Sequence, residues 1–177
     1  MRQTQTRTIR QAGGRPIAPK IITIGVYGFT EATFFDALLA HGVDLFCDIR
    51  QRRGLRGREY AFANSQRLQK RLAELGIGYA HLKHLAPTPE VRRQQQLVDM
   101  ASGVQKRARN QLSQAFIEAY ETTILADFDT QTFLDQVGSA AMLALFCVER
   151  EPEACHRSLL AGKLALSLAL NVEHVSP

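Results

Sequence analysis

The chain has 177 residues, of which 45% are hydrophobic and 22% charged, a composition that excludes a fibrous or disordered protein. Its longest apolar stretches are far shorter than the ~20 residues of a membrane-spanning helix, and the N-terminus lacks the apolar core of a secretory signal, so we expect a cytoplasmic protein with no membrane partner. The net charge of +5 comes from residues 1–20, which hold five bases and no acid, because the remaining 17 bases balance the 17 acids. The net charge is therefore no evidence for general affinity for nucleic acid, and only local basic patches remain.

The chain divides into a tail and one domain. Residues 1–20 are polar, contain two glycines and two prolines, and show no apolar periodicity, which predicts a flexible basic tail. Residues 21–177 have room for one substantial core and predict a single α/β domain. Three cysteines in a cytoplasmic chain do not make a disulfide framework, so we expect reduced thiols.

Short apolar runs alternate with helical patterns along this domain. Strands are predicted at 21–26, 43–49, 77–82 and 140–148, with a last short one at 172–175. Helices are predicted after Thr30, from Asn64 or Ser65, and at 112–125, 132–137 and 153–170, with a loop and a helix of marginal packing within 87–109. This alternation predicts a mainly parallel sheet of about four or five strands with helices on both faces.

Polar and small residues gather where the predicted strands end. In such a sheet the functional site lies outside the carboxyl ends of the strands, so these residues are expected to meet at one edge. They come from four separate segments: Gly25; Asp48 and Arg50; His81; and Cys147, Glu149, Cys155, His156 and Arg157.

These residues also resemble the domain of unknown function 488 family, over about Ile21 to Val175. The resemblance rests on Gly25, on Asp48-Ile49-Arg50, on His81, and above all on Cys147 to Arg157, whose pattern Cys-x-Glu-x-x-Pro-x-x-Cys-His-Arg is long and specific. It implies an α/β Rossmann-like layer but no agreed activity.

The chain departs from that family pattern at two places. Gly25-Val26-Tyr27 stands where many members carry Gly-His-Ser, and Leu85-Ala86-Pro87 stands where Leu-Gly-Gly follows the family histidine. Any role of the family's first histidine is therefore not carried over to this chain.

The thiols allow several interpretations. Cys147 either closes a buried strand as a small apolar residue or is a nucleophile activated by His156, Arg157 and a helix N-terminus. Cys155 lies at the predicted helix start, where a thiolate is favoured, and a redox pair with Cys147 would span eight positions, unlike Cys-x-x-Cys. A metal set with His81 lacks paired ligand spacing, and the adjacent Cys155 and His156 are expected to point apart on a helix, so we predict no metal site.

The arginines at the strand ends suggest an anion site. Arg157 and His156 lie in the first turn of the predicted helix, and Arg50 could add a bidentate fork for phosphate or carboxylate. Gly25, His81 and Cys155 are assigned to the same anion or substrate site. The alternative is that Asp48 or Glu149 holds these arginines in internal salt bridges, and both interpretations remain open.

A second basic feature is the loop at 50–58, RQRRGLRGR, with five arginines in nine residues. Its glycines would let the backbone approach a ligand, and Tyr60 and Phe62 could stack on a base. The alternative is a solvated surface loop. The candidate nucleic-acid contacts are Arg52, Arg53, Arg56 and Arg58, while Lys83, His84, Arg92 and Arg93 are expected to be surface charges.

Two functions follow from these patterns. The first is an enzyme acting on a phosphorylated or nucleotide-like substrate or a nucleic-acid base, with Asp48 or Glu149 in acid–base chemistry and Cys147 as nucleophile. The second is a non-catalytic module that binds nucleic acid through the arginine loop and the tail. The partner is accordingly a phosphate-bearing small molecule or nucleic acid, and the residues indicate no particular cofactor and no oligomeric state.

Overall fold

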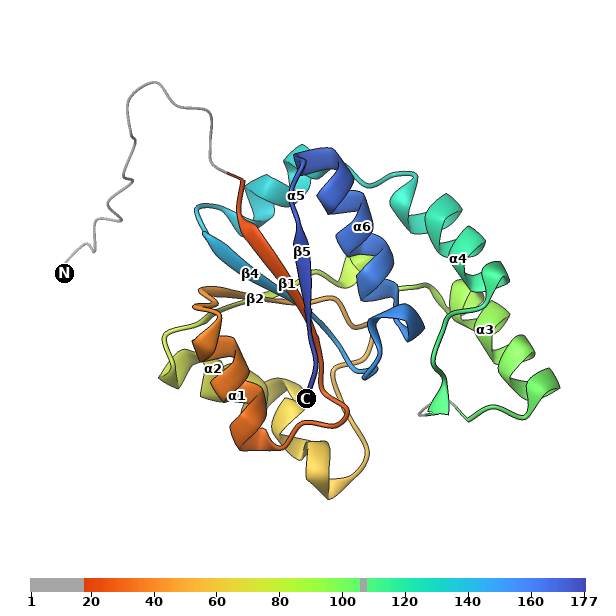
Figure 1. Ribbon diagram of the computed structural model, residues 1–177, viewed down its shortest axis with the longest axis horizontal. Helices are drawn as coiled ribbons and strands as arrows, with labels where there is room; N and C mark the ends of the chain where they lie inside the picture. The colour runs from red at the N-terminus through yellow and green to blue at the C-terminus, as the bar shows by residue number, and fades with distance from the viewer. Residues whose placement is uncertain (1–17, 106–107) are drawn as a thin grey trace.

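A computed structural model describes residues 18–105 and 108–177 (Figure 1). Five strands form one sheet in the order β3-β2-β4-β1-β5, and every pairing is parallel. The strands are β1 (Lys20–Gly25), β2 (Leu45–Asp48), β3 (Gly78–His81), β4 (Met142–Cys147) and β5 (Val172–Val175). The predicted parallel α/β fold is confirmed. The predicted tail falls mostly on residues 1–17, outside the described residues, and its last residue, Lys20, already belongs to β1.

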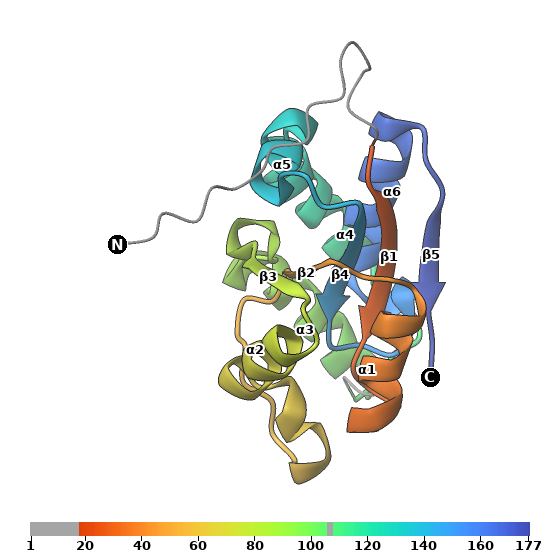
Figure 2. The same cartoon turned by 90° about the vertical axis from the view of Figure 1, so that its left-hand side faces the viewer.

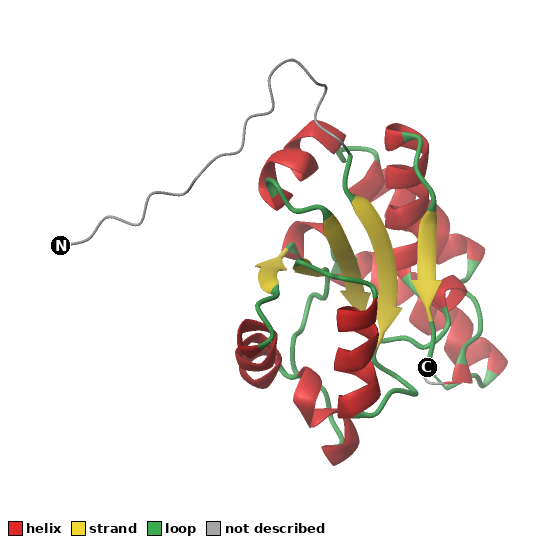
Figure 3. Cartoon of the chain, turned by 60° about the vertical axis from the view of Figure 1, so that its left-hand side comes forward, coloured by secondary structure: helices red, strands yellow, loops and turns green. Residues whose placement is uncertain are grey.

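Helices cover both faces of this sheet (Figures 2 and 3). On one face lie α1 (Glu31–Ala40), the 3-10 segment η1 (Arg58–Ala63) and α2 (Ser65–Glu74). The other face carries α3 (Pro89–Ser102), α4 (Gln114–Tyr120), the π-helical segment η4 (Glu121–Leu125), α5 (Thr130–Val137) and α6 (His156–Leu168). Two short 3-10 turns, η2 (Lys83–Leu85) and η5 (Pro152–Ala154), complete the described elements. No described helix is long and apolar enough to cross a membrane.

The two-sided sheet follows from strands that are apolar at successive positions. In β4, Leu143 and Leu145 pack in the core on the side of α4 to α6, whereas Ala144 and Phe146 pack with α1 and α2. Successive side chains of a strand point to opposite faces, so a continuously apolar strand needs cover on both. β4 lies at the centre of the sheet, between β1 and β2, and is covered on both faces.

Several predicted helix boundaries are confirmed and two are wrong. Thr30 caps α1, accepting a hydrogen bond from the backbone N–H of Thr33, as its sequence position indicated. The predicted helix 112–125 is instead α4 followed by the π-helical segment. The predicted helix 153–170 begins later, because η5 ends at Ala154 and Cys155 is extended, with φ −139° and ψ 139°. Residues 156–168 alone form α6.

Candidate functional site

A cavity of about 600 Å³ lies at the carboxyl ends of β2 and β4. The segment after β2 supplies one wall through Arg50, Arg52 and Leu55, and the start of α3 supplies another through Pro89, Arg92 and Gln95. Further polar and reactive lining residues come from the segment before α4 and from the β4–α6 connection: Arg109, Cys147, Glu149, Cys155 and His156. The strand-end rule therefore located this cavity from the sequence, although it did not foresee the part played by α3.

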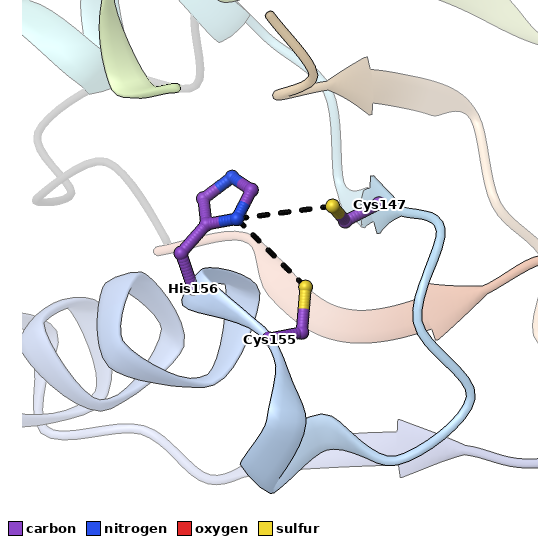
Figure 4. A group of neighbouring side chains, drawn as sticks. All are labelled: Cys147, Cys155 and His156. Atoms are coloured by element: carbon purple, nitrogen blue, oxygen red, sulfur yellow. Dashed lines mark hydrogen bonds between the residues drawn. The ribbon is translucent and has the colours of Figure 1, made fainter. Parts of the chain in front are cut away.

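Two thiols and an imidazole meet in the lining of this cavity (Figure 4). The Nδ1 atom of His156 lies 3.8 Å from the Sγ atom of Cys147 and 3.8 Å from that of Cys155. The opposite ring atom, Nε2, lies 3.1 Å from the carbonyl oxygen of Ile49. Because a carbonyl oxygen only accepts, Nε2 carries a proton and donates, and Nδ1 is the ring atom that faces the sulfurs.

The local backbone explains how neighbouring residues point to one place. The expectation that Cys155 and His156 diverge on a helix is wrong, because Cys155 is the extended N-cap residue and only His156 has begun the helix. Pro152 at the start of η5 turns the chain after β4 and returns it towards Cys147. Cys147, Cys155 and His156 are all buried, and their ligand atoms lie within 4.8 Å of one another.

The two thiols of this cluster have opposite pKa shifts. A hydrogen bond to Cys155, together with burial, raises the pKa of the Cys147 thiol well above its ordinary value. Burial also raises the pKa of Cys155, but the hydrogen bond from Cys147 and the nearby His156 and Arg157 outweigh it and hold that pKa well below the ordinary value. Cys155 is therefore the better thiolate, whereas the sequence had favoured Cys147 as the nucleophile.

The third thiol lies elsewhere. Cys47 is fully buried in β2, on the face packed by α4 to α6, and it does not line the cavity. Burial raises its pKa to about 12, so the thiol stays protonated.

Asp48 and Arg50 form a buried ion pair. The guanidinium donates from Nε to Oδ1 of Asp48 at 2.8 Å and from Nη2 to Oδ2 at 2.7 Å, and its Nη1 donates to the carbonyl oxygen of Ala63. The Asp48 carboxylate also accepts a 2.8 Å hydrogen bond from the hydroxyl of Tyr79, whose pKa burial raises to about 12. Asp48 does not line the cavity, and these contacts match the internal salt bridge that the sequence left open.

Arg157 and Gly25 lie behind the cavity. The fully buried Arg157 donates to the carbonyl oxygens of Glu149 and Arg150 at 2.6 and 2.8 Å. A Cβ atom on Gly25 would meet Glu149 and Arg157, so glycine permits the close approach of β1 to this turn. Neither residue lines the cavity, and both support the chain that carries Glu149.

Of the other predicted site residues, Glu149 lines the cavity and His81 does not. His81 Nε2 lies 2.9 Å from the carbonyl oxygen of Arg50 and does not line the cavity. Glu149 does line it, with Oε1 3.6 Å from Nη2 of Arg109, which is also paired with Asp99 at 2.9 Å.

The loop at 50–58 contributes one arginine to the cavity lining beyond Arg50. Arg52 is exposed and lines the cavity, whereas Arg53 is half-buried and donates to Tyr79 at 3.4 Å. Arg56 and Arg58 are exposed and lie outside the cavity lining.

Sequence reasoning missed two cationic residues of the cavity. Arg92 was expected to be a surface charge, and Arg109 was assigned no role. The signal for Arg92 was the start of its helix: Thr88 caps α3 and Pro89 follows, which places Arg92 in the first turns, next to the cavity.

No curated protein and no solved structure matches this chain significantly. The family model described as Domain of unknown function DUF488 matches residues 31–164, a range that holds the Asp-x-Arg and Cys-His-Arg segments and the whole cavity lining. The chain therefore belongs to the DUF488 family.

Proposed function

We propose that this protein is an enzyme that binds a phosphate-bearing, nucleotide-like small molecule in the cavity and transforms it at the cluster of Cys147, Cys155 and His156. The observation that carries the proposal is that one cavity of about 600 Å³ contains both this cluster and two arginines, Arg52 and Arg92, that make no salt bridge among the described residues. The volume is that of a small-molecule site.

The anion would be bound by Arg52 and Arg92. Arg50, Arg109 and Arg157 are already bonded to carboxylates or carbonyls. By contrast, neither Arg52 nor Arg92 makes a salt bridge to any residue within 18–105 or 108–177. A guanidinium that lines a cavity and makes no salt bridge within these described residues is suited to bind a phosphate oxygen pair.

The reacting part of the substrate would face the sulfurs and His156. Glu149 lines the same cavity and supplies the acid–base group, in the role that the sequence assigned to it or to Asp48. The proposal retains Glu149 and leaves Asp48 to its ion pair with Arg50.

The test is a binding and turnover screen with nucleoside monophosphates and inorganic phosphate as probes. We expect at least one nucleotide to bind, and the double variant Arg52→Gln, Arg92→Gln to weaken its binding by about tenfold or more, since each lost charge-assisted hydrogen bond contributes 1 kcal/mol or more. Arg58→Gln is the matched control, because it removes an exposed arginine of the same loop that does not line the cavity.

Turnover of the bound nucleotide is followed by mass spectrometry. Cys155→Ser and Glu149→Gln should bind the nucleotide and abolish its conversion. The proposal fails if no probe binds, or if the double arginine variant binds as tightly as the unaltered chain.

The nucleic-acid-binding alternative is tested with the same variants and a single-stranded oligonucleotide. If the chain is such a module, affinity falls with salt and with loss of Arg56 and Arg58, and no mononucleotide is converted. The enzyme proposal instead expects the effects to be largest at Arg52 and Arg92, the pair that lines the cavity.

A further inference from the structure

We propose that Cys147, Cys155 and His156 bind one Zn²⁺ ion, with a fourth coordination position open to the cavity. This inference deepens the proposed function and rests on it, because it names the chemistry of the same reactive cluster. These three side chains, from the end of β4 and the start of α6, converge on one point beside the cavity.

The donor set is the first argument. Two thiolates and an imidazole nitrogen are ligands that zinc prefers, whereas magnesium and calcium prefer oxygen. Two thiolates also neutralise both positive charges of Zn²⁺. The zinc-loaded cluster therefore has no net charge next to the buried guanidinium of Arg157, which acts electrostatically on both sulfurs.

The distances are the second argument. Zinc bonds of about 2.3 Å to sulfur and about 2.0–2.1 Å to nitrogen give a sulfur–nitrogen separation of roughly 3.6 Å around a tetrahedral ion. Nδ1 of His156 lies 3.8 Å from each of the two sulfurs. All three atoms lie within 4.8 Å of one another, and two sulfurs on a tetrahedral zinc ion lie roughly 3.8 Å apart, so a change of about 1 Å or less in the sulfur–sulfur separation would complete the geometry.

The hydrogen bond on the far side of the imidazole is the third argument. A metal-bound histidine donates its other N–H to a carbonyl or carboxylate, which fixes the ring and directs the free nitrogen at the ion. His156 has this arrangement, because Nε2 donates to the carbonyl oxygen of Ile49 and Nδ1 faces the sulfurs.

The number of ligands favours a catalytic rather than a structural ion. Structural zinc sites are closed by four protein ligands, whereas catalytic sites have three and keep a position for water or substrate. Among the described residues no fourth histidine, cysteine or carboxylate joins this group, and His81, the other ligand considered from the sequence, contacts the Arg50 carbonyl. Glu149, two residues after Cys147, lines the cavity without joining the ligand set. Zinc deaminases of nucleobases likewise combine cysteine and histidine ligands with a glutamate that is not a ligand.

The experiment uses the full chain, purified with reductant, stripped with a chelator and dialysed against Zn²⁺ alone. We expect about one zinc ion per chain by elemental analysis, and a rise in Tm because the ion binds the folded chain. Co²⁺ in place of Zn²⁺ should give thiolate-to-cobalt charge-transfer absorption and the intense visible bands of a tetrahedral ion.

Three variants and one control locate the ion. Cys147→Ser, Cys155→Ser and His156→Asn should each weaken zinc binding by about 100-fold or more. Cys47→Ala is the matched control, because it removes the third buried thiol and leaves the three ligands in place. If a variant does not fold, the cobalt spectrum of the unaltered chain still tests the proposal.

The zinc inference is overturned if the unaltered chain retains no zinc, if its cobalt form lacks the thiolate absorption, or if folded Cys155→Ser binds zinc as tightly. These results are distinct from failure of the proposed function. If the chain binds no zinc but still binds a nucleotide through Arg52 and Arg92, only the zinc inference is rejected. If the chain binds zinc but no nucleotide, the proposed substrate class is rejected.

Discussion

A Cβ atom placed on Gly25 would lie 1.8 Å from the carbonyl oxygen of Glu149. The same oxygen accepts the 2.6 Å hydrogen bond from Nη1 of the buried Arg157. The end of β1 therefore touches the backbone that carries Glu149 away from β4, and only glycine leaves room for this contact. The contact thus joins the end of β1 to the backbone of a cavity-lining residue that is 124 positions later in the chain.

Gly25→Ala should destabilise the protein by about 3 kcal/mol, because the added methyl group overlaps a backbone atom that cannot move without breaking the Arg157 hydrogen bonds. Urea denaturation followed by circular dichroism measures this change. Gly162→Ala is the control: it lies within α6 with no atom within 4 Å of a new Cβ, so it should stabilise by about 0.5–1 kcal/mol. Equal stability of the Gly25 variant and the unaltered chain would contradict the geometry.

The second prediction concerns the stability contributed by the buried ion pair of Asp48 and Arg50. Asp48→Asn should cost about 3–5 kcal/mol of unfolding free energy, because it leaves a buried guanidinium without its counter-charge. Glu74→Gln, which removes the exposed partner of Arg71, should cost less than about 1 kcal/mol. If Asp48→Asn instead folds with full stability and loses only activity, the carboxylate is catalytic rather than structural.

The fold could be predicted from the sequence because its signals are periodic and local. The consecutively apolar segments at β1 and β4, such as Leu143 to Phe146, indicate strands buried on both faces, and strands of that kind in alternation with helices imply a parallel sheet. Thr30 bears the side chain that caps α1, so the start of that helix could be located as well.

The candidate site was predicted only in part, because sequence patterns do not say which polar side chains are already bonded within the protein. Arg50, Arg157, Cys155 and His156 all belong to the same strand-end motifs. Arg157 nevertheless lies outside the cavity lining and is bonded to backbone carbonyls, and Arg50 lines the cavity but is paired with Asp48, whereas the cysteine and histidine form the reactive cluster. The extended conformation of Cys155 depends on the turn that η5 makes after β4. The periodicity of apolar residues in the sequence does not predict this turn. Arg92 reaches the cavity by tertiary packing of α3, so its position in the chain carried little information.

Tyr120 provides a third prediction, on the helical wall of the site. Its hydroxyl is fully buried and donates a 2.7 Å hydrogen bond to the carbonyl oxygen of Leu85, which precedes the cavity-lining Pro87. Tyr120→Phe leaves that carbonyl without this donor and should cost about 1–3 kcal/mol in urea denaturation. A loss well below 1 kcal/mol would show that the connection after β3 does not depend on this hydrogen bond.

The last prediction concerns the pH dependence of stability at the β1–β5 edge. The Nδ1 atom of His174 lies 2.7 Å from Oγ1 of Thr23, and burial, reinforced by Arg157, lowers the pKa of His174 below its ordinary value of 6.5. The unfolded chain therefore binds a proton more readily at this residue, so its contribution to stability is present above pH 6.5 and is lost as the pH falls towards the native pKa.

The pKa of His41 is shifted in the opposite direction to that of His174, so the two residues can be compared. Its hydrogen bond to the Ala37 carbonyl, with help from Glu173, raises its pKa above 6.5, so its contribution is present below pH 6.5 and is lost as the pH rises through the native value. Urea denaturation across pH 5 to 8 measures the contributions of both histidines to stability, because these pH values bracket the ordinary histidine pKa of about 6.5. His174→Gln should reduce the loss of stability on the acid side, and His41→Gln should reduce the loss on the basic side. If the two variants change the pH profile in the same direction, at least one of these native pKa shifts has the wrong sign.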